Sequence, residues 1–187
     1  TLRIAVAALM LVGAPCAYAQ TTDLLISEYV EGSGTNKAIE IYNGTGSAVN
    51  LGTSQYRLEL YSNGAASPST SVALTATIAN GDVLVLCNAT DAGITSQCDV
   101  TSTAVINFNG DDAVVLRKNS ASAGNGTVID SLGQVGFDPG SEWGTGLQST
   151  ADNTIRRMSS VCTGDTNTGD AFVPTLQWDG FANGTYG

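Results

Sequence analysis

The chain of 187 residues contains no histidine. Imidazole is the side chain that titrates nearest neutral pH, and hydrolytic enzymes commonly use it as acid, base or metal ligand. Serine residues such as Ser27 and Ser131 therefore lack the base of a Ser-His-Asp triad. This absence favours a binding or structural module over an enzyme.

Basic residues are few: seven Lys and Arg stand against 17 Asp and Glu, a formal charge of -10. Proteins that bind nucleic acid normally neutralise phosphates with Lys and Arg. The composition therefore disfavours direct nucleic-acid binding unless cations bridge the contact. Two adjacent basic pairs, Arg117-Lys118 and Arg156-Arg157, form either a small anion-facing patch or solvated strand ends.

Long apolar runs are confined to the N-terminus, where Arg3 precedes an apolar stretch over residues 4–12 and the small-residue pattern Ala17-Tyr18-Ala19. This layout predicts a helical signal peptide over residues 1–19, cleaved after Ala19 and too short to span a membrane. Residues 20–187 are then one domain of a secreted protein, extracellular or periplasmic. Without Arg3, six basic residues face 17 acidic ones, a formal charge of -11.

Three of the four cysteines follow the predicted cleavage site: Cys87, Cys98 and Cys162. An exported chain meets oxidising conditions, but three pairings remain open from sequence. Cys87–Cys98 is favoured because Cys87 ends an apolar strand and the intervening Gly- and Asn-containing loop can fold back. Cys162 would then be a free thiol or an intermolecular partner.

Short strands with turn residues between them follow the leader, and no segment keeps a helical period. In residues 56–61 the charged Arg57 and Glu59 alternate with apolar residues, which predicts one face in the core and one in water. Residues 83–87 are uniformly apolar and predict a central strand covered on both faces. Asn109-Gly110 predicts a tight hairpin between residues 106–108 and 111–116, with positive φ at the turn. Further strands are expected at 24–30, 38–42, 71–74, 127–135 and 153–158, so the fold class is all-β, a sandwich.

Five segments together resemble the lamin-tail domain family of the bacterial secreted type: 25–33, 37–43, 107–116, 130–136 and 154–157. The resemblance implies an immunoglobulin-like β-sandwich without catalytic activity, used for protein or surface interaction, targeting or scaffolding. In such bacterial proteins the module often precedes a secreted nuclease or phosphoesterase, so this chain is expected to be the N-terminal part of a larger extracellular hydrolase. The alternative is an accessory domain that delivers an attached nuclease to extracellular DNA. The catalytic histidines of those enzymes are absent here, so nuclease activity is not carried over.

Clustered acidic residues make calcium a candidate cofactor. Asp111 and Asp112 follow the Asn-Gly turn, with Asp130 and Asp138 further along, and oxygen ligands on loops suit Ca²⁺. The spacing does not match an EF-hand loop. Asp residues beside a turn also commonly just stabilise it, which is the alternative.

Glu28, Glu31 and Glu40 invite comparison with the paired carboxylates of glycosidases. The favoured interpretation places Glu28 and Glu40 on the outward faces of adjacent strands, with Lys37 nearby as a counter-charge. Trp143 lies in the loop-like segment 138–144. Its indole is either exposed for recognition of a ligand or packed as a cap on the core.

Overall fold

The computed structural model describes residues 20–88, 90 and 94–186. The predicted signal-peptide helix over residues 1–19 lies outside the described residues. Within the described part, no helical segment has the length and apolar character needed to cross a membrane.

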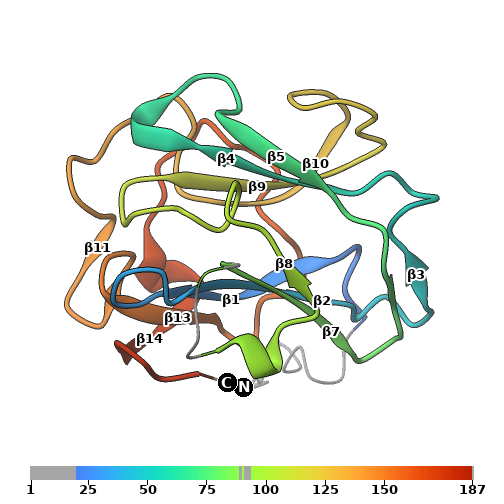
Figure 1. Ribbon diagram of the computed structural model, residues 1–187, viewed down its shortest axis with the longest axis horizontal. Coiled ribbons are helices and arrows are strands. Elements are labelled where there is room, and N and C mark those ends of the chain that lie inside the picture. Colours follow the sequence, from blue (N-terminus) through green and yellow to red (C-terminus); the bar gives the residue numbers. More distant parts are fainter. Residues whose placement is uncertain (1–19, 89, 91–93, 187) are drawn as a thin grey trace, which may run out of the picture.

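Two β-sheets lie face to face and form the body of the molecule (Figure 1). The larger sheet has the strand order β14-β13-β1-β2-β7-β8, in which all neighbours are antiparallel except the parallel pair β7–β8. Its strands are β1 (Leu25–Glu31), β2 (Lys37–Tyr42), β7 (Val83–Cys87), β8 (Val100–Thr101), β13 (Asn153–Arg157) and β14 (Trp178–Ala182). The smaller sheet is antiparallel with the order β10-β9-β4-β5, formed by β4 (Arg57–Tyr61), β5 (Thr70–Ala73), β9 (Ala113–Lys118) and β10 (Thr127–Leu132).

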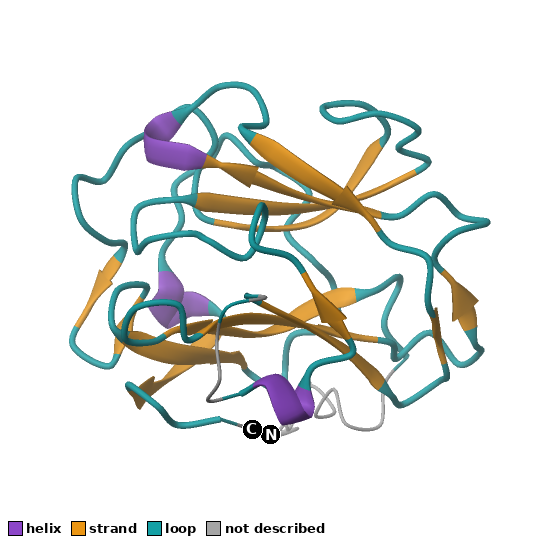
Figure 2. Cartoon of the chain, in the orientation of Figure 1, coloured by secondary structure: helices purple, strands orange, loops and turns teal. Residues whose placement is uncertain are grey.

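Short elements complete the chain (Figure 2). Two small ribbons pair β3 (Val49–Asn50) with β6 (Thr77–Ile78) and β11 (Gly144–Thr145) with β12 (Gln148–Ser149). Three 3-10 turns are η2 (Ser62–Gly64), η3 (Thr95–Gln97) and η4 (Pro174–Leu176). The fold is thus an immunoglobulin-like β-sandwich. Of the nine segments predicted to be strands, eight contain a strand, and the exception is the first arm of the hairpin, residues 106–108.

The core lies between the two sheets and follows the period of two expected for strands. Ile39 and Ile41 of β2 and Leu84 and Leu86 of β7 point inward and are almost completely buried. The intervening residues of the same strands face outward. Trp178 of β14 is also fully buried and closes the core near the C-terminus.

A β-bulge in β1 changes which residues of that strand face the core. The register against β2 shifts between Ile26 and Glu28. Ile26 and Tyr29 consequently both belong to the core although they are three residues apart. Without the extra residue, Glu28 would point inward with Ile26. The bulge therefore places Glu28 on the outer face of the sheet.

The predicted hairpin at Asn109-Gly110 is wrong. Residues 106–108 form no strand, and neither Asn109 nor Gly110 has the positive φ that the turn requires. Ile106 and Phe108 are instead fully buried in a connection that crosses from β8 in one sheet to β9 in the other. Gly110 is needed for close approach, because a Cβ there would lie 2.5 Å from the Ala151 Cβ.

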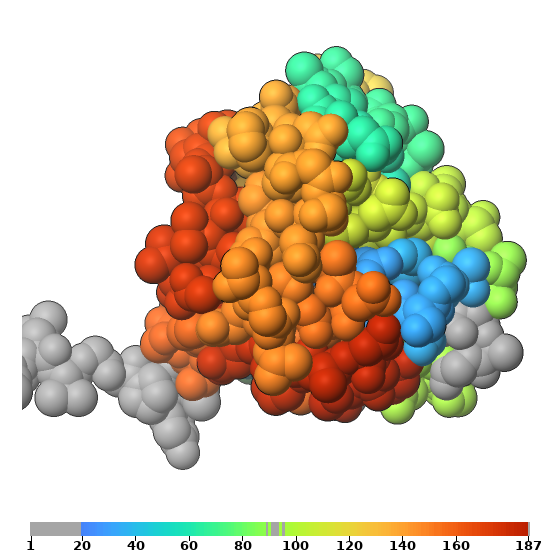
Figure 3. Space-filling model, turned by 90° about the vertical axis from the view of Figure 1, so that its left-hand side faces the viewer, coloured from blue at the N-terminus to red at the C-terminus, as the bar shows by residue number. Residues whose placement is uncertain are grey.

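The outer face of the smaller sheet is covered rather than exposed to water. The segment between β10 and β13 runs down one side of the sandwich, seen in orange in Figure 3. Glu59, expected to face solvent, is fully buried: its carboxylate lies 2.9 Å from Arg117 Nε and accepts hydrogen bonds from the Tyr61 hydroxyl and the Gly124 amide. The strand periodicity predicted the side of Glu59, but not its burial by Arg117 and by Gly124 of the connection between β9 and β10.

β7 also differs from expectation. It is the neighbour of edge strand β8, and its inward residues Leu84 and Leu86 are buried. On its outer face Cys87 is buried, while Val83 and Val85 are half-buried. The expectation of burial on both faces is wrong for these two residues. They line a pocket described below.

Cys87 and Cys98 form a disulfide with a Cα–Cα distance of 5.8 Å, which confirms the favoured pairing. Cys162 is also disulfide-bonded, and the described residues contain no free cysteine. The expectation of a free thiol at Cys162 is therefore wrong.

We expect the double substitution Cys87→Ser/Cys98→Ser to lower the free energy of unfolding by about 3 kcal/mol, because the cross-link restricts the unfolded chain. Urea unfolding of the oxidised protein and of the double variant measures this difference. The single substitution Cys98→Ser serves as the control, since it removes the same cross-link. A loss below about 1 kcal/mol in both variants would show that the disulfide contributes little.

Candidate functional site

Most buried carboxylates are used to hold the fold. Asp130 is fully buried, and its carboxylate accepts hydrogen bonds from the backbone amides of Ile26, Ser131 and Asp165. It also forms an ion pair with Arg157. Ile26 belongs to the other sheet, so this carboxylate ties the two layers together. Burial raises the pKa of Asp130, while Arg157 and the amides act in the opposite direction.

The basic side chains are also engaged with partners. Five ion pairs occur among the described residues: Lys37–Glu31, Arg117–Glu59, Lys118–Asp23, Arg156–Glu28 and Arg157–Asp130. Arg57 donates instead to the Ser71 hydroxyl and to two backbone carbonyls. Both basic pairs of the sequence are thus distributed over separate ion pairs. Lys37 pairs with Glu31 and not with Glu28 or Glu40.

The structure places the two candidate calcium ligands, Asp111 and Asp112, in different surroundings. Asp112 is buried, and its two oxygens accept the amides of Asn63 and Asn109, each at 2.8 Å. Its carboxylate thus stabilises the turn, as in the alternative interpretation. One oxygen of Asp111 is buried with no hydrogen-bond partner among the described residues. In that part of the chain no three His, Cys, Asp or Glu side chains are grouped to hold a metal ion. The carboxylates of Asp130 and Asp138 accept other amides, those of Ile26 and Gly140 respectively.

Burial gives the protein an expected dependence on pH. The pKa values of Asp112, Asp130 and Asp165 are raised, mainly because burial disfavours the charged form. In the unfolded chain these groups ionise at about pH 4. Between that pH and the raised values the folded state binds more protons than the unfolded state. Their contribution to stability is therefore largest at low pH and declines as the pH rises through this window.

We therefore expect the melting temperature to rise when the pH is lowered from 7 towards 5, because the folded state takes up protons on these buried groups before the unfolded state does. Thermal unfolding followed by circular dichroism measures it. Asp165→Asn removes one of the titrating groups and should flatten the profile. A melting temperature that falls steadily from pH 7 to 5 would contradict the expectation.

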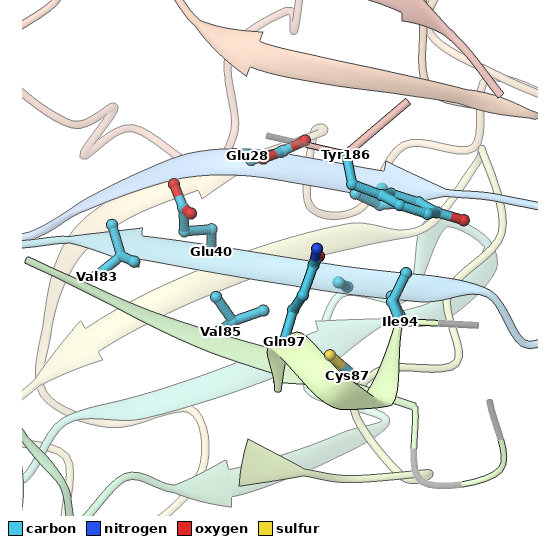
Figure 4. A pocket seen from close by; sticks show the side chains of 10 residues that line it. Glu28, Glu40, Val83, Val85, Cys87, Ile94, Gln97 and Tyr186 are labelled. Atoms are coloured by element: carbon cyan, nitrogen blue, oxygen red, sulfur yellow. The ribbon is translucent and has the colours of Figure 1, made fainter. Parts of the chain in front are cut away.

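A pocket of about 270 Å³ lies on the outer face of the six-stranded sheet, over β1, β2 and β7 (Figure 4). The strands contribute outward side chains to it, and η3 with its preceding residue and the C-terminal segment form the walls. The lining residues are Glu28, Val30, Ala38, Glu40, Val83, Val85, Cys87, Ile94, Gln97 and Tyr186. The Cys87–Cys98 disulfide fastens the η3 segment to the sheet beside this pocket.

Two carboxylates on adjacent strands face the same side of the sheet in this pocket. Glu28 and Glu40 are direct partners in the register of β1 and β2, which confirms their predicted outward placement. Residues directly opposite in an antiparallel pair have Cβ atoms roughly 4.5–5.5 Å apart. Glu28 lies 3.1 Å from Arg156 Nε, and Glu40 accepts a 2.7 Å hydrogen bond from the Ser27 hydroxyl. None of the five ion pairs in the described part includes Glu40, so its charge is not balanced by a direct basic contact.

Residues 17–136 match the family model of the Lamin Tail Domain. The chain belongs to the lamin tail domain family. This family consists of non-catalytic immunoglobulin-like domains, in agreement with the sandwich described above. No curated protein matches the chain.

In this lamin tail domain Trp143 is buried, so the structure does not show the exposed indole of the first interpretation. Its side chain is 6 % exposed and packs with Tyr61 and Val115 on the outer face of the smaller sheet. Its ring meets Phe172 edge to face, with 5.9 Å between the centroids. The segment 138–144 is loop-like as predicted, but it folds over an apolar sheet face. The indole therefore packs as a cap, the second of the two interpretations.

Sequence reasoning found Glu28 and Glu40 but missed the pocket around them. The uniformly apolar run of β7 predicts burial on both faces, whereas Val83 and Val85 line the pocket. Ile94, Gln97 and Tyr186 lie far from β1 in sequence and carry no local signal of a site. The sequence signal that could have indicated the pocket is a pair of carboxylates on adjacent strands, next to apolar residues that point outward.

Proposed function

We propose that this lamin tail domain is an exported, non-catalytic interaction module and that it binds its partner through the pocket over β1, β2 and β7. The observation that carries the proposal is the composition of this pocket: apolar walls surround two carboxylates on an outer sheet face. Binding sites are typically concave and mostly apolar, with a few polar groups that orient the ligand. Such pockets usually measure roughly 300–1,000 Å³ for drug-sized ligands. A volume of about 270 Å³ suits a single side chain of a partner.

The same carboxylates do not suggest hydrolysis. A retaining glycosidase needs one carboxyl as a proton donor and the other as a nucleophile, on either side of the scissile bond. Glu28 is instead held in an ion pair with Arg156, and Glu40 by the Ser27 hydroxyl. We expect no turnover of chromogenic glycosides or phosphodiesters by the purified protein. Turnover abolished by Glu28→Gln and by Glu40→Gln would overturn the non-catalytic part of the proposal.

The alternative of DNA delivery has less support. Five of the six basic side chains in the described chain are in ion pairs with carboxylates, so no cluster of unpaired cations is available for phosphates. Attachment to a larger extracellular hydrolase remains compatible with an interaction module. In that arrangement the pocket would direct the hydrolase to a protein or a surface.

A panel of capped tripeptides, acetyl-Gly-X-Gly-amide with each amino acid as X, tests the binding function. Two-dimensional NMR spectra of the ¹⁵N-labelled protein report where each peptide binds. We expect at least one peptide to shift the amide signals of Glu40, Val85 and Gln97 in a saturable manner. No saturable shift at these positions with any of the peptides would overturn the assignment of this pocket as the binding site.

Export is tested separately. When the gene is expressed in a host with a secretory pathway, we expect the released protein to lack residues 1–19. Intact-mass spectrometry of the released protein measures the cleavage site. A protein retained in the cytoplasm with residues 1–19 attached would contradict export.

A further inference from the structure

The pocket's charge indicates which side chain it accepts. Its lining contains two acidic residues, Glu28 and Glu40, and no basic residue. Like charges directly opposite on neighbouring strands destabilise a sheet unless a cation lies nearby. Arg156 provides such a cation for Glu28 from the next strand, β13, where it is itself held 4.3 Å from the Phe181 ring. Within the described chain, the Glu40 side chain has only the neutral hydroxyl of Ser27 as a polar contact. The site is therefore complementary to one additional positive charge.

The apolar lining indicates a ligand with an aliphatic stem. Val83 and Val85 project beside Glu40, and Ile94 lies across the pocket from them (Figure 4). Long basic side chains bury their methylene groups on apolar surface and keep the charged end at polar groups. The Tyr186 ring offers a further face that attracts a cation. Apolar wall and acidic end thus match the two parts of one basic side chain.

We propose that the pocket binds a lysine side chain of a partner polypeptide, with the ammonium group at Glu28 and Glu40 and the stem along Val83 and Val85. This inference rests on the proposed function, and it specifies the chemistry of the partner. A lysine ammonium is compact and donates three hydrogen bonds, so it can contact carboxylates from two strands together. An arginine guanidinium is a planar fork that fits one carboxylate best. The paired carboxylates therefore favour lysine.

The test compares four peptides of the form acetyl-Gly-X-Gly-amide: lysine, Nε-acetyl-lysine, norleucine and arginine at X. Titrations monitored by NMR give the dissociation constant of each peptide. We expect the lysine peptide to bind at least about tenfold more tightly than the Nε-acetyl-lysine and norleucine peptides, since both lack the charge. We expect the arginine peptide to bind more weakly than the lysine peptide. Addition of salt should weaken lysine binding, because the pocket is open to solvent.

Glu40→Gln is the deciding variant. Glutamine keeps an oxygen that can accept the Ser27 hydroxyl, so we expect the protein to fold normally, and its melting temperature and near-ultraviolet circular dichroism verify this. Lysine binding should weaken by about tenfold, the effect of losing a charged hydrogen-bond partner. Glu142→Gln makes the same change in the segment that covers the other sheet, and it should leave lysine binding unchanged.

The outcomes separate this inference from the proposed function. Equal binding of the lysine and norleucine peptides, or preference for another side chain, would overturn the lysine assignment while leaving an interaction pocket in place. Equal effects of Glu40→Gln and Glu142→Gln would show general charge attraction and would also overturn it. Absence of any peptide binding at this pocket would overturn both proposals.

Discussion

Replacement of Arg157 by methionine is expected to lower the free energy of unfolding by about 3–5 kcal/mol, the usual effect of leaving one partner of a buried ion pair alone. The Arg157 side chain is 4 % exposed, and the Asp130 side chain is fully buried. Methionine can still pack on Trp178, over which the Arg157 guanidinium lies at 4.0 Å from the ring centroid. It cannot balance the Asp130 charge. Equilibrium unfolding in urea, followed by tryptophan fluorescence, measures the loss.

Arg57→Met is the matched control for this prediction. Arg57 is half-buried and donates to a hydroxyl and to carbonyls, with no carboxylate partner in an ion pair among the described residues. Its replacement should cost about 1 kcal/mol. The double variant Asp130→Asn/Arg157→Met should lose less than the sum of its two single changes, because the groups are coupled. Equal losses for Arg157→Met and Arg57→Met would contradict a special role for the buried pair.

The Asp130–Arg157 pair also bears on the extent of the domain. The family match covers residues 17–136, and Arg157 lies beyond it in β13. β13 pairs directly with β1, and β14 pairs with β13, so both strands extend the six-stranded sheet. Trp178 of β14 belongs to the same core as β1 and β2. Residues beyond the family match are therefore part of the same sandwich.

The strands could be predicted because each depends on a local pattern, either alternation or a short apolar run between turn residues. In β2 the inward Ile39 and Ile41 alternate with outward Ala38 and Glu40, and this pattern requires no knowledge of the partner strands. The disulfide was also accessible, since the strand ending at Cys87 and the short loop after it favour a local cross-link. These features depend on residues close together in the chain.

The misassigned features depend on distant residues. The local turn signal at Asn109-Gly110 is overridden because Gly110 packs against Ala151 and because Ile106 fills the core. Glu59 is buried because the Gly124 amide and Arg117 reach it from other segments. The pocket requires the bulge between Ile26 and Glu28, whose position the sequence does not reveal. Tertiary packing decides each of these outcomes.

Trp143→Ala is expected to destabilise the protein by about 3–5 kcal/mol, the usual effect of removing a large aromatic side chain from a packed site. Trp143 joins the loop over the smaller sheet to Tyr61, Ala113 and Val115, which are themselves buried. Its fit is close: a Cβ at Gly133 would lie 2.8 Å from the indole ring. Removal of the ring would leave a cavity on this face and loosen the covering loop. Urea unfolding followed by circular dichroism measures the loss without depending on the tryptophan signal.

Trp143→Phe separates packing from polar recognition. The indole Nε1 is buried without a hydrogen-bond partner among the described residues, so phenylalanine removes no hydrogen bond made within them. It keeps an aromatic ring against Phe172 and should be destabilised much less than Trp143→Ala. If Trp143 were instead a recognition residue, Trp143→Ala would leave stability nearly unchanged and weaken ligand binding. The indole packs the loop onto the smaller sheet, on the opposite side of the sandwich from the pocket. We therefore expect a large loss of stability for Trp143→Ala and a small one for Trp143→Phe. The folded Trp143→Phe variant should still bind the lysine peptide.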